Sequence, residues 1–255
     1  MPETPAIEVQ NLSKSYSTPA GLLPVLRQVN LRVPTGAFTS IIGPSGSGKS
    51  TLFNIIAGLE HPDAGTVLLA GQPATGQRGQ VAYMPQRDAL LPWRTVLDNA
   101  VLATTVQRGD VAAARREARA LLPTFGLEGF GESLPAALSG GMRQRAALLR
   151  TVMWKQPMML LDEPFGALDA ITRAQLQRWL LTLWDELDRT VLLVTHDVDE
   201  AILLSDYVAV LTARPARVAL TLTMDLPRPR TYQMITTPAF ARLKEQLLAA
   251  LGDEL

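Results

Sequence analysis

A Gly- and Ser-rich stretch near the N-terminus has the residue types and spacing of a phosphate-binding loop. GPSGSGKST, residues 43–51, fits the pattern GxxxxGK[ST], with an apolar strand-like run before it and a helix-like run after it. Glycines let backbone N–H groups approach a β-phosphate closely, Lys49 brings a positive charge to the β- and γ-phosphates, and the Ser50 hydroxyl suits Mg²⁺. An ordinary turn that caps a helix is the alternative interpretation. The predicted phosphate-binding residues are Gly43, Pro44, Ser45, Gly46, Ser47, Gly48, Lys49, Ser50 and Thr51.

Two adjacent acids follow an apolar run in MMLLDE, residues 158–163. A buried strand of a parallel sheet would present both at its C-terminal end, where ligands bind. Asp162 is predicted to hold Mg²⁺, through water. Glu163 is expected to point elsewhere, because neighbouring strand residues alternate in direction, and to act as general base on an attacking water. Without the phosphate loop, the pair would indicate only a strand that ends at a turn.

A second Gly-rich turn, LSGGMRQR at residues 138–145, opens onto a basic helix. Backbone N–H groups at such a helix N-terminus can bind a phosphate. The alternative is that Ser139 only caps the helix, and both roles are compatible. The sequence thus offers two candidate phosphate-binding turns.

The elements that must position these residues alternate between strand and helix. Strand-like runs are predicted at 7–12, 25–33, 38–43, 66–71, 81–86, 158–162, 190–197, 207–212 and 218–223. Helical patterns occupy 49–59, much of 96–125, 142–154, 171–187, 198–205 and 239–251. This alternation predicts an α/β fold with a mainly parallel sheet and helices on both faces, while the early strands (7–33 and 66–71) look antiparallel and suggest a side sheet.

The amino-acid composition excludes several kinds of protein and of metal site. The 255 residues are 47% hydrophobic, with 24 basic and 24 acidic residues, so a globular chain without a basic nucleic-acid surface is expected. No cysteine is present, which excludes disulfides and thiolate metal sites, and two histidines are too few for a histidine metal site. We expect no signal peptide and no membrane span, with a cytoplasmic location as the default.

Other phosphate-loop classes fit poorly. A GTPase needs a guanine-reading NKxD tetrapeptide, which does not occur in the sequence. A small-molecule kinase would need an arginine-rich lid and would leave LSGG unexplained.

Over nearly its whole length the chain resembles the ATP-binding subunits of ATP-binding cassette (ABC) transporters. LSKSY, GPSGSGKS, MPQ, LSGGMRQR, MMLLDEP followed by GALD, and VTHD occur in the order of that family's motifs. The resemblance implies one ABC ATPase domain, 1–255, a P-loop NTPase core with an antiparallel β subdomain and an α-helical subdomain. The helical subdomain is expected at about 87–155, and a C-terminal connector and helix at 226–255.

The resemblance also implies roles for individual residues. Tyr16 is expected to stack on adenine, although a plain strand-end aromatic is the alternative. Gln86 is expected to touch Mg²⁺ and the attacking water, and His196 to contact the γ-phosphate, although a core histidine is its alternative. Asp169 lies in the expected inter-subunit loop. His61 is expected to be a solvated loop residue.

In that family two copies pair head to tail with ATP between them. Ser139, Gly140 and Gly141 would then grip the γ-phosphate bound to the other copy, assisted by the helix dipole. Met142, where many cassettes have glutamine, is expected to leave activity intact. LLRTVM at 148–153 departs from the usual ARAL-like run and is expected to affect packing rather than chemistry.

The segment after Gln86 carries an apolar patch, Leu90, Leu91, Pro92 and Trp93. Exposed apolar patches mark partner surfaces, and in the family this region receives a short helix of the membrane subunit. The alternative is that Trp93 packs into the helical subdomain. Two membrane permease subunits and an extracytoplasmic solute-binding protein are the implied partners, with the chain peripheral on the inner face of the cell membrane and no nucleic acid involved.

The stretches LLPWRTVLDN and LSGGMRQR are similar to sequences of the importer branch for nitrate, sulfonates and taurine. The first is also similar to sequences of ATPases that serve uptake of thiamine pyrimidine precursors. An exporter cassette is the first alternative, although exporters often fuse the cassette to membrane helices. A soluble ABC ATPase acting on DNA or ribosomes is the second, although such proteins carry coiled-coil insertions, tandem cassettes or basic surfaces.

Overall fold

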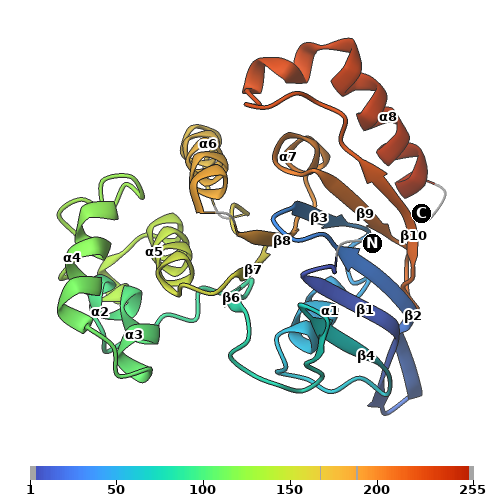
Figure 1. The fold of residues 1–255 in the computed structure, drawn as a ribbon, viewed down its shortest axis with the longest axis horizontal. Coiled ribbons are helices and arrows are strands. Elements are labelled where there is room, and N and C mark those ends of the chain that lie inside the picture. The colour runs from blue at the N-terminus through green and yellow to red at the C-terminus, as the bar shows by residue number, and fades with distance from the viewer. Residues whose placement is uncertain (1–3, 167, 188, 253–255) are drawn as a thin grey trace.

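The computed structural model describes residues 4–166, 168–187 and 189–252. Two β-sheets and a group of helices make up this part of the chain (Figure 1). The terminal residues of the expected units 1–255 and 226–255, and Ala167 of the GALD motif, lie outside the described residues.

The larger sheet has six strands in the order β10-β9-β3-β8-β7-β6. Neighbours from β9 to β6 pair in parallel, and β10 is an antiparallel edge strand. The central strands are buried along their whole length, as expected where helices cover both faces of a parallel sheet. Their bounds are β3 Phe38–Ile42, β6 Ala82–Met84, β7 Met158–Asp162, β8 Thr190–Val194, β9 Tyr207–Leu211 and β10 Val218–Thr223.

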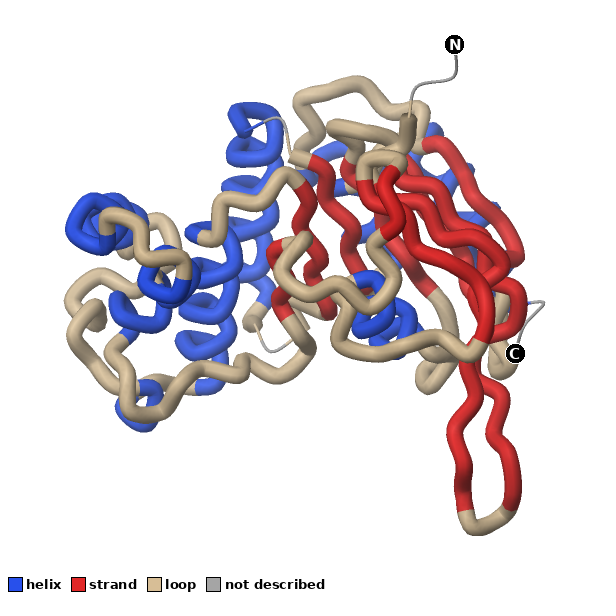
Figure 2. The backbone as a smooth tube through the Cα atoms, turned by 60° about the horizontal axis from the view of Figure 1, so that its bottom comes forward, coloured by secondary structure: helices blue, strands red, loops and turns tan. Residues whose placement is uncertain are grey.

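The smaller sheet is antiparallel, in the order β2-β1-β4-β5, which confirms the predicted side sheet. Its strands are β1 Ile7–Thr18, β2 Gly21–Val33, β4 Ala64–Leu69 and β5 Gln72–Pro73. Both β1 and β2 run longer than predicted, because they pair as far as the hairpin turn between Thr18 and Gly21. The end of this hairpin projects beyond the rest of the sheet (Figure 2).

The helices are α1 Lys49–Ile56, α2 Val96–Ala100, α3 Leu102–Val106, α4 Val111–Leu121, α5 Gly140–Met153, α6 Ala170–Leu187, α7 Val198–Leu204 and α8 Pro238–Gly252. The helical pattern predicted over 96–125 is divided among three helices, α2, α3 and α4. Thr95 and Asp110 cap the first and third, through hydrogen bonds from the backbone N–H groups of Asp98 and Ala113. The predicted extended connector, 226–233, ends in a short 3₁₀ turn, Tyr232–Thr236, before α8.

Helices α2 to α5 lie together beside the β6 edge of the large sheet, on the side away from the small sheet (Figures 1 and 2). Three apolar clusters stabilise this arrangement. Phe125 belongs to the cluster between these helices and the large sheet, Phe53 to the one between the two sheets, and Phe240 to the one under α7 and α8. All three phenylalanines are fully buried.

Among the described helices, none combines the length and the apolar character that a bilayer crossing requires.

Candidate functional site

The phosphate loop connects the end of β3 to the first residue of α1, as the sequence predicts. Gly46 and Gly48 have φ angles of +74° and +103°, which side chains with a Cβ rarely adopt. A Cβ on Gly48 would stand 2.7 Å from Cγ1 of Val25. The loop therefore requires glycine here, and its backbone curls in front of the N-terminus of α1, where N–H groups can bind an anion.

Lys49 lies at the centre of the loop. Its ammonium donates hydrogen bonds to the carbonyl oxygens of Gly43 and Pro44, at 2.9 and 2.8 Å. Burial lowers the pKa of Lys49, while Glu163 and Asp162 act in the opposite direction. The two acids therefore help to keep a charged ammonium at the bottom of the site.

Asp162 ends β7 and is 1% exposed. Neither of its carboxylate oxygens has a hydrogen-bond partner among the described residues. Burial raises the pKa of this carboxyl, and Glu163 adds to the rise, while Ser50 and Lys49 oppose it. Buried unpaired carboxylate oxygens are costly, and a cation would satisfy them, so Asp162 and the adjacent Ser50 fit Mg²⁺. Within the described residues, no group of three His, Cys, Asp or Glu side chains could hold a metal.

Glu163 lies just beyond β7 with a φ of +50°, so its backbone has left the strand conformation and strand alternation does not set its direction. Nε2 of Gln86 donates to Oε2 of Glu163 at 3.0 Å. Nδ1 of His196 lies 3.7 Å from Oε1 of the same carboxylate. The structure thus brings together three residues that the sequence placed on separate strands, following β6, β7 and β8.

These residues share a cleft of about 760 Å³ with the phosphate loop. Tyr16 closes one side, and its hydroxyl lies 3.4 Å from Oγ1 of Thr51. Lys14 lies 5.4 Å from the centre of the Tyr16 ring. The cleft is lined by Tyr16, Leu23, Val25, Ser45, Gly46, Gly48, Lys49, Ser50, Thr51, Gln86, Glu163, His196 and Arg214.

The second Gly-rich turn does not line this cleft. Oγ of Ser139 accepts a hydrogen bond from the N–H of Met142 at 3.3 Å, which is the predicted cap of α5. Ser139 and Gly140 are exposed. Asp169 is also exposed and caps α6, accepting from the N–H groups of Ile171 and Thr172. These two parts of the predicted site therefore face solvent in the single chain.

Helix α5 also holds the segment after Gln86, which sequence reasoning missed. Arg150 donates to the carbonyl oxygens of Asp88 and Ala89 at 2.7 and 2.6 Å, and Arg143 pairs with the Asp88 carboxylate at 3.1 Å. On the same helix, Gln144 donates to the carbonyl oxygen of Glu163 at 3.1 Å. The helix that carries LSGG is thus bonded to both sides of the Gln86–Glu163 pair.

Arg214, Leu23 and Val25 are further cleft residues that the sequence did not identify. For Arg214, the feature that could have identified it is its position in the loop after β9. Because β9 pairs in parallel with β3, the loop after β9 must emerge beside the phosphate loop. This position can be inferred only when the order of the strands in the sheet is known.

The fold and the motifs agree with the comparisons to known proteins. The family model described as ABC transporter matches residues 26–166. The aliphatic sulfonates import ATP-binding protein SsuB 2 of Streptomyces avermitilis is 44% identical over 97% of this chain and 91% of its own length. The formylaminopyrimidine import ATP-binding protein ThiZ of Halalkalibacterium halodurans is 43% identical over 81% of this chain and 79% of its own length. A dimeric bacterial ABC transporter cassette superposes with a TM-score of 0.79 and 31% identity, over 87% of this chain and all of that chain.

The chain belongs to the ABC transporter family. Within that family it is an ATP-binding subunit, and its activity is ATP hydrolysis.

Proposed function

We propose that this chain is the ATPase subunit of an importer and that ATP binds in the cleft between Tyr16 and His196. The observation that carries the proposal is the convergence of Gln86 and His196 on the Glu163 carboxylate, directly in front of the phosphate loop. Tyr16 offers a ring for the adenine, and the loop N–H groups with Lys49 bind the phosphates.

Ser50, Asp162 and Gln86 would hold Mg²⁺. Bound Mg²⁺ supplies charge neutralisation on the β- and γ-phosphates. Asp162 suits this role because its two carboxylate oxygens are buried without partners. Gln86 would thereby connect the metal to the residue that acts on water.

Glu163 is the proposed general base. One of its oxygens accepts from Gln86, and the other faces His196. A carboxylate held from two sides can orient a water in line with the γ-phosphate and accept its proton. His196 would position the γ-phosphate and the carboxylate relative to each other.

Hydrolysis requires a second copy of the chain in this proposal. Ser139 caps α5, and Gly140 and Gly141 begin it, where backbone N–H groups can bind a phosphate, but all three lie outside the cleft of their own chain. In a head-to-tail homodimer they would reach the γ-phosphate held by the partner's loop, with Asp169 at the interface. The likeness to a dimeric cassette supports this arrangement.

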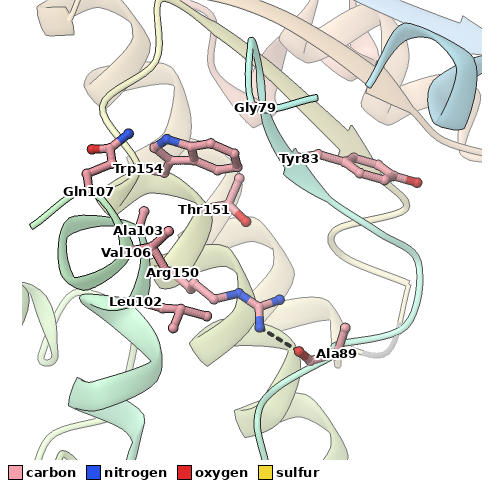
Figure 3. Close-up of a pocket in the computed structure, with 10 residues that line it drawn as sticks. All are labelled: Gly79, Tyr83, Ala89, Leu102, Ala103, Val106, Gln107, Arg150, Thr151 and Trp154. Carbon is pink, nitrogen blue, oxygen red and sulfur yellow. Dashed lines mark hydrogen bonds between the residues drawn. The ribbon is translucent and has the colours of Figure 1, made fainter. Parts of the chain in front are cut away.

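A membrane subunit is proposed to dock in a second, apolar cleft. This cleft of about 580 Å³ lies between α3, α5 and the segments flanking β6 (Figure 3). Val106 in its wall is 74% exposed, and the indole N–H of Trp154 is buried without a partner among the described residues. A short amphipathic helix with one acceptor group fits such a site.

The apolar patch predicted at residues 90–93 follows Ala89, which lines this cleft, but only part of the patch is exposed. Trp93 is 72% exposed, so the alternative that it packs into the helical subdomain is wrong. Leu90 is 8% exposed and belongs to the core instead. Arg150 lines the cleft and holds Ala89, so an occupant of the cleft would act on the segment that follows Gln86 (Figure 3).

The names of the relatives place them in sulfonate and formylaminopyrimidine import. We propose a solute of one of these kinds, or nitrate or taurine, delivered by a solute-binding protein to two membrane subunits. The chain would then sit peripherally on the cytoplasmic side of the membrane.

The proposal is tested with Glu163→Gln, which keeps the side-chain size and removes the base. We expect loss of ATP turnover by at least about a hundredfold and, in size-exclusion chromatography, a dimer that forms only with Mg-ATP. The wild-type chain with ADP is the control and should remain monomeric. A variant that stays monomeric with ATP and still hydrolyses it would overturn both the base and the shared site.

A further inference from the structure

Arg214 lies in the turn between β9 and β10, and that turn is fixed to β2. The N–H of Ala216 donates to the carbonyl oxygen of Val25 at 2.8 Å, and the N–H of Arg27 donates to the carbonyl oxygen of Ala216 at 2.9 Å. Ala216 is fully buried. The backbone that carries Arg214 is therefore held rigidly between the large sheet and the hairpin.

From this position the guanidinium of Arg214 lies against the phosphate loop. Its Nη2 is 3.2 Å, and its Nε 3.8 Å, from the point where a Cβ on Gly46 would stand. Arg214 also lines the cleft that contains Lys49 and Ser50. A side chain larger than hydrogen at Gly46 would push the guanidinium away.

The guanidinium has no hydrogen-bond or ion-pair partner within the described part of the chain, and the residue is exposed. The other cation of the cleft, Lys49, already donates to two loop carbonyls. A planar guanidinium presents paired N–H donors that match phosphate oxygens in a fork. A guanidinium without a protein partner beside a phosphate loop is placed to donate to phosphate oxygens.

We infer that Arg214 is a nucleotide-binding residue whose guanidinium contacts the phosphate chain of ATP, in addition to Lys49. This inference rests on the proposed function, because it places ATP in the cleft. Arg214 comes from the opposite side of the loop to Glu163, since β9 and β7 lie on either side of the β3–β8 pair. It therefore strengthens binding of the nucleotide and takes no part in proton transfer.

Arg217, in the same turn, provides a matched control. It is exposed, and it does not line the cleft. Replacing either arginine by glutamine removes a charge at nearly constant length. Since both side chains are exposed, both variants should fold with an unchanged melting temperature when no nucleotide is present.

The experiment measures the affinity of wild type, Arg214→Gln, Arg214→Lys and Arg217→Gln for ADP and for a non-hydrolysable ATP analogue by calorimetry. Competition of tripolyphosphate against a fluorescent ADP provides a probe without a base. We expect Arg214→Gln to weaken all three by about tenfold, Arg214→Lys to recover part of the loss, and Arg217→Gln to match wild type.

Unchanged affinities in Arg214→Gln would overturn the inference and leave the proposed function standing. A loss for ADP without a loss for tripolyphosphate would also overturn it, because the contact would then involve the base or ribose. If wild type and Lys49→Ala bound nucleotide equally poorly, the proposed function itself would fail, and the inference with it.

Discussion

The side-chain amide of Gln86 donates a hydrogen bond of 3.0 Å to the carboxylate of Glu163 across 77 residues of sequence. Gln86 follows β6 and Glu163 follows β7, and these strands are parallel neighbours. The bond therefore joins two strand ends at the edge where the phosphate loop lies. A displacement of Gln86 would therefore alter a hydrogen bond to the proposed base.

The first prediction concerns this bond. Gln86→Ala frees one oxygen of Glu163, so the carboxylate is less well oriented, and we expect kcat to fall about tenfold. ADP affinity measured without Mg²⁺ should change less than about twofold, because Gln86 does not belong to the phosphate loop. Steady-state ATPase assays and calorimetry check both values. An equal loss of ADP affinity would show that Gln86 shapes the whole cleft.

The second prediction concerns Asp162, whose folded-state pKa is raised above the ordinary aspartate value, mainly by burial. The native state then binds more protons than the unfolded state, so its stability falls as the pH rises above the unfolded pKa of about 4. Asp162→Asn removes this contribution. We expect the variant to be more stable than wild type at pH 7 without nucleotide, with a difference that shrinks towards pH 4.

The free energy of unfolding of wild type and Asp162→Asn, measured with urea from pH 4 to 8, tests the second prediction. The same variant should also bind Mg-ATP more weakly than wild type. An Asp162→Asn profile parallel to that of wild type would contradict the assignment of a buried unpaired carboxylate.

The third prediction concerns Arg150, which holds two carbonyl oxygens of the segment after Gln86. Lysine cannot donate in the same fork, so Arg150→Lys should loosen residues 86–91. Hydrogen exchange of the amides in this segment should become faster, while exchange in α1 stays unchanged. Arg116→Lys, on the exposed side of α4, is the control. Unchanged exchange would mean that Arg143, through Asp88, and Asn99, through Leu91, suffice to fix the segment.

Much of the fold follows from the sequence because the strands are strongly patterned. MMLLD is β7 as predicted, and the strand–loop–helix around Lys49 is confirmed. The sequence does not predict the full length of β1 and β2. These ends pair with each other up to a hairpin turn, and polar residues such as Lys14 and Ser15 give no strand pattern there.

The site could be predicted wherever a motif is continuous in sequence, as for the phosphate loop and the acid pair. Arg214 and the Arg150 bonds could not, because each depends on strand order or on the packing of α5 against a loop. The LLRTVM segment was expected to concern packing alone, yet its Arg150 holds the segment after Gln86. Long-range contacts of this kind leave no periodic signal in the chain.

The last prediction concerns the apolar cleft beside α3 (Figure 3). Val106→Glu places a charge on its wall, and a docked apolar helix would have to bury that charge without a partner. We expect the amount of membrane subunit that co-purifies with the variant to fall at least about tenfold. Because Val106 is 74% exposed, the melting temperature of the isolated chain should stay within about 2 °C of wild type.

Leu248→Glu is the matched control, since Leu248 is also an exposed apolar residue, at 49%, but lies on α8. It should co-purify with the membrane subunit as wild type does. Trp93→Ser tests the neighbouring exposed side chain and should give an intermediate loss, because Trp93 does not line the cleft itself. Equal co-purification of Val106→Glu and Leu248→Glu would mean that the membrane subunit docks elsewhere on the chain.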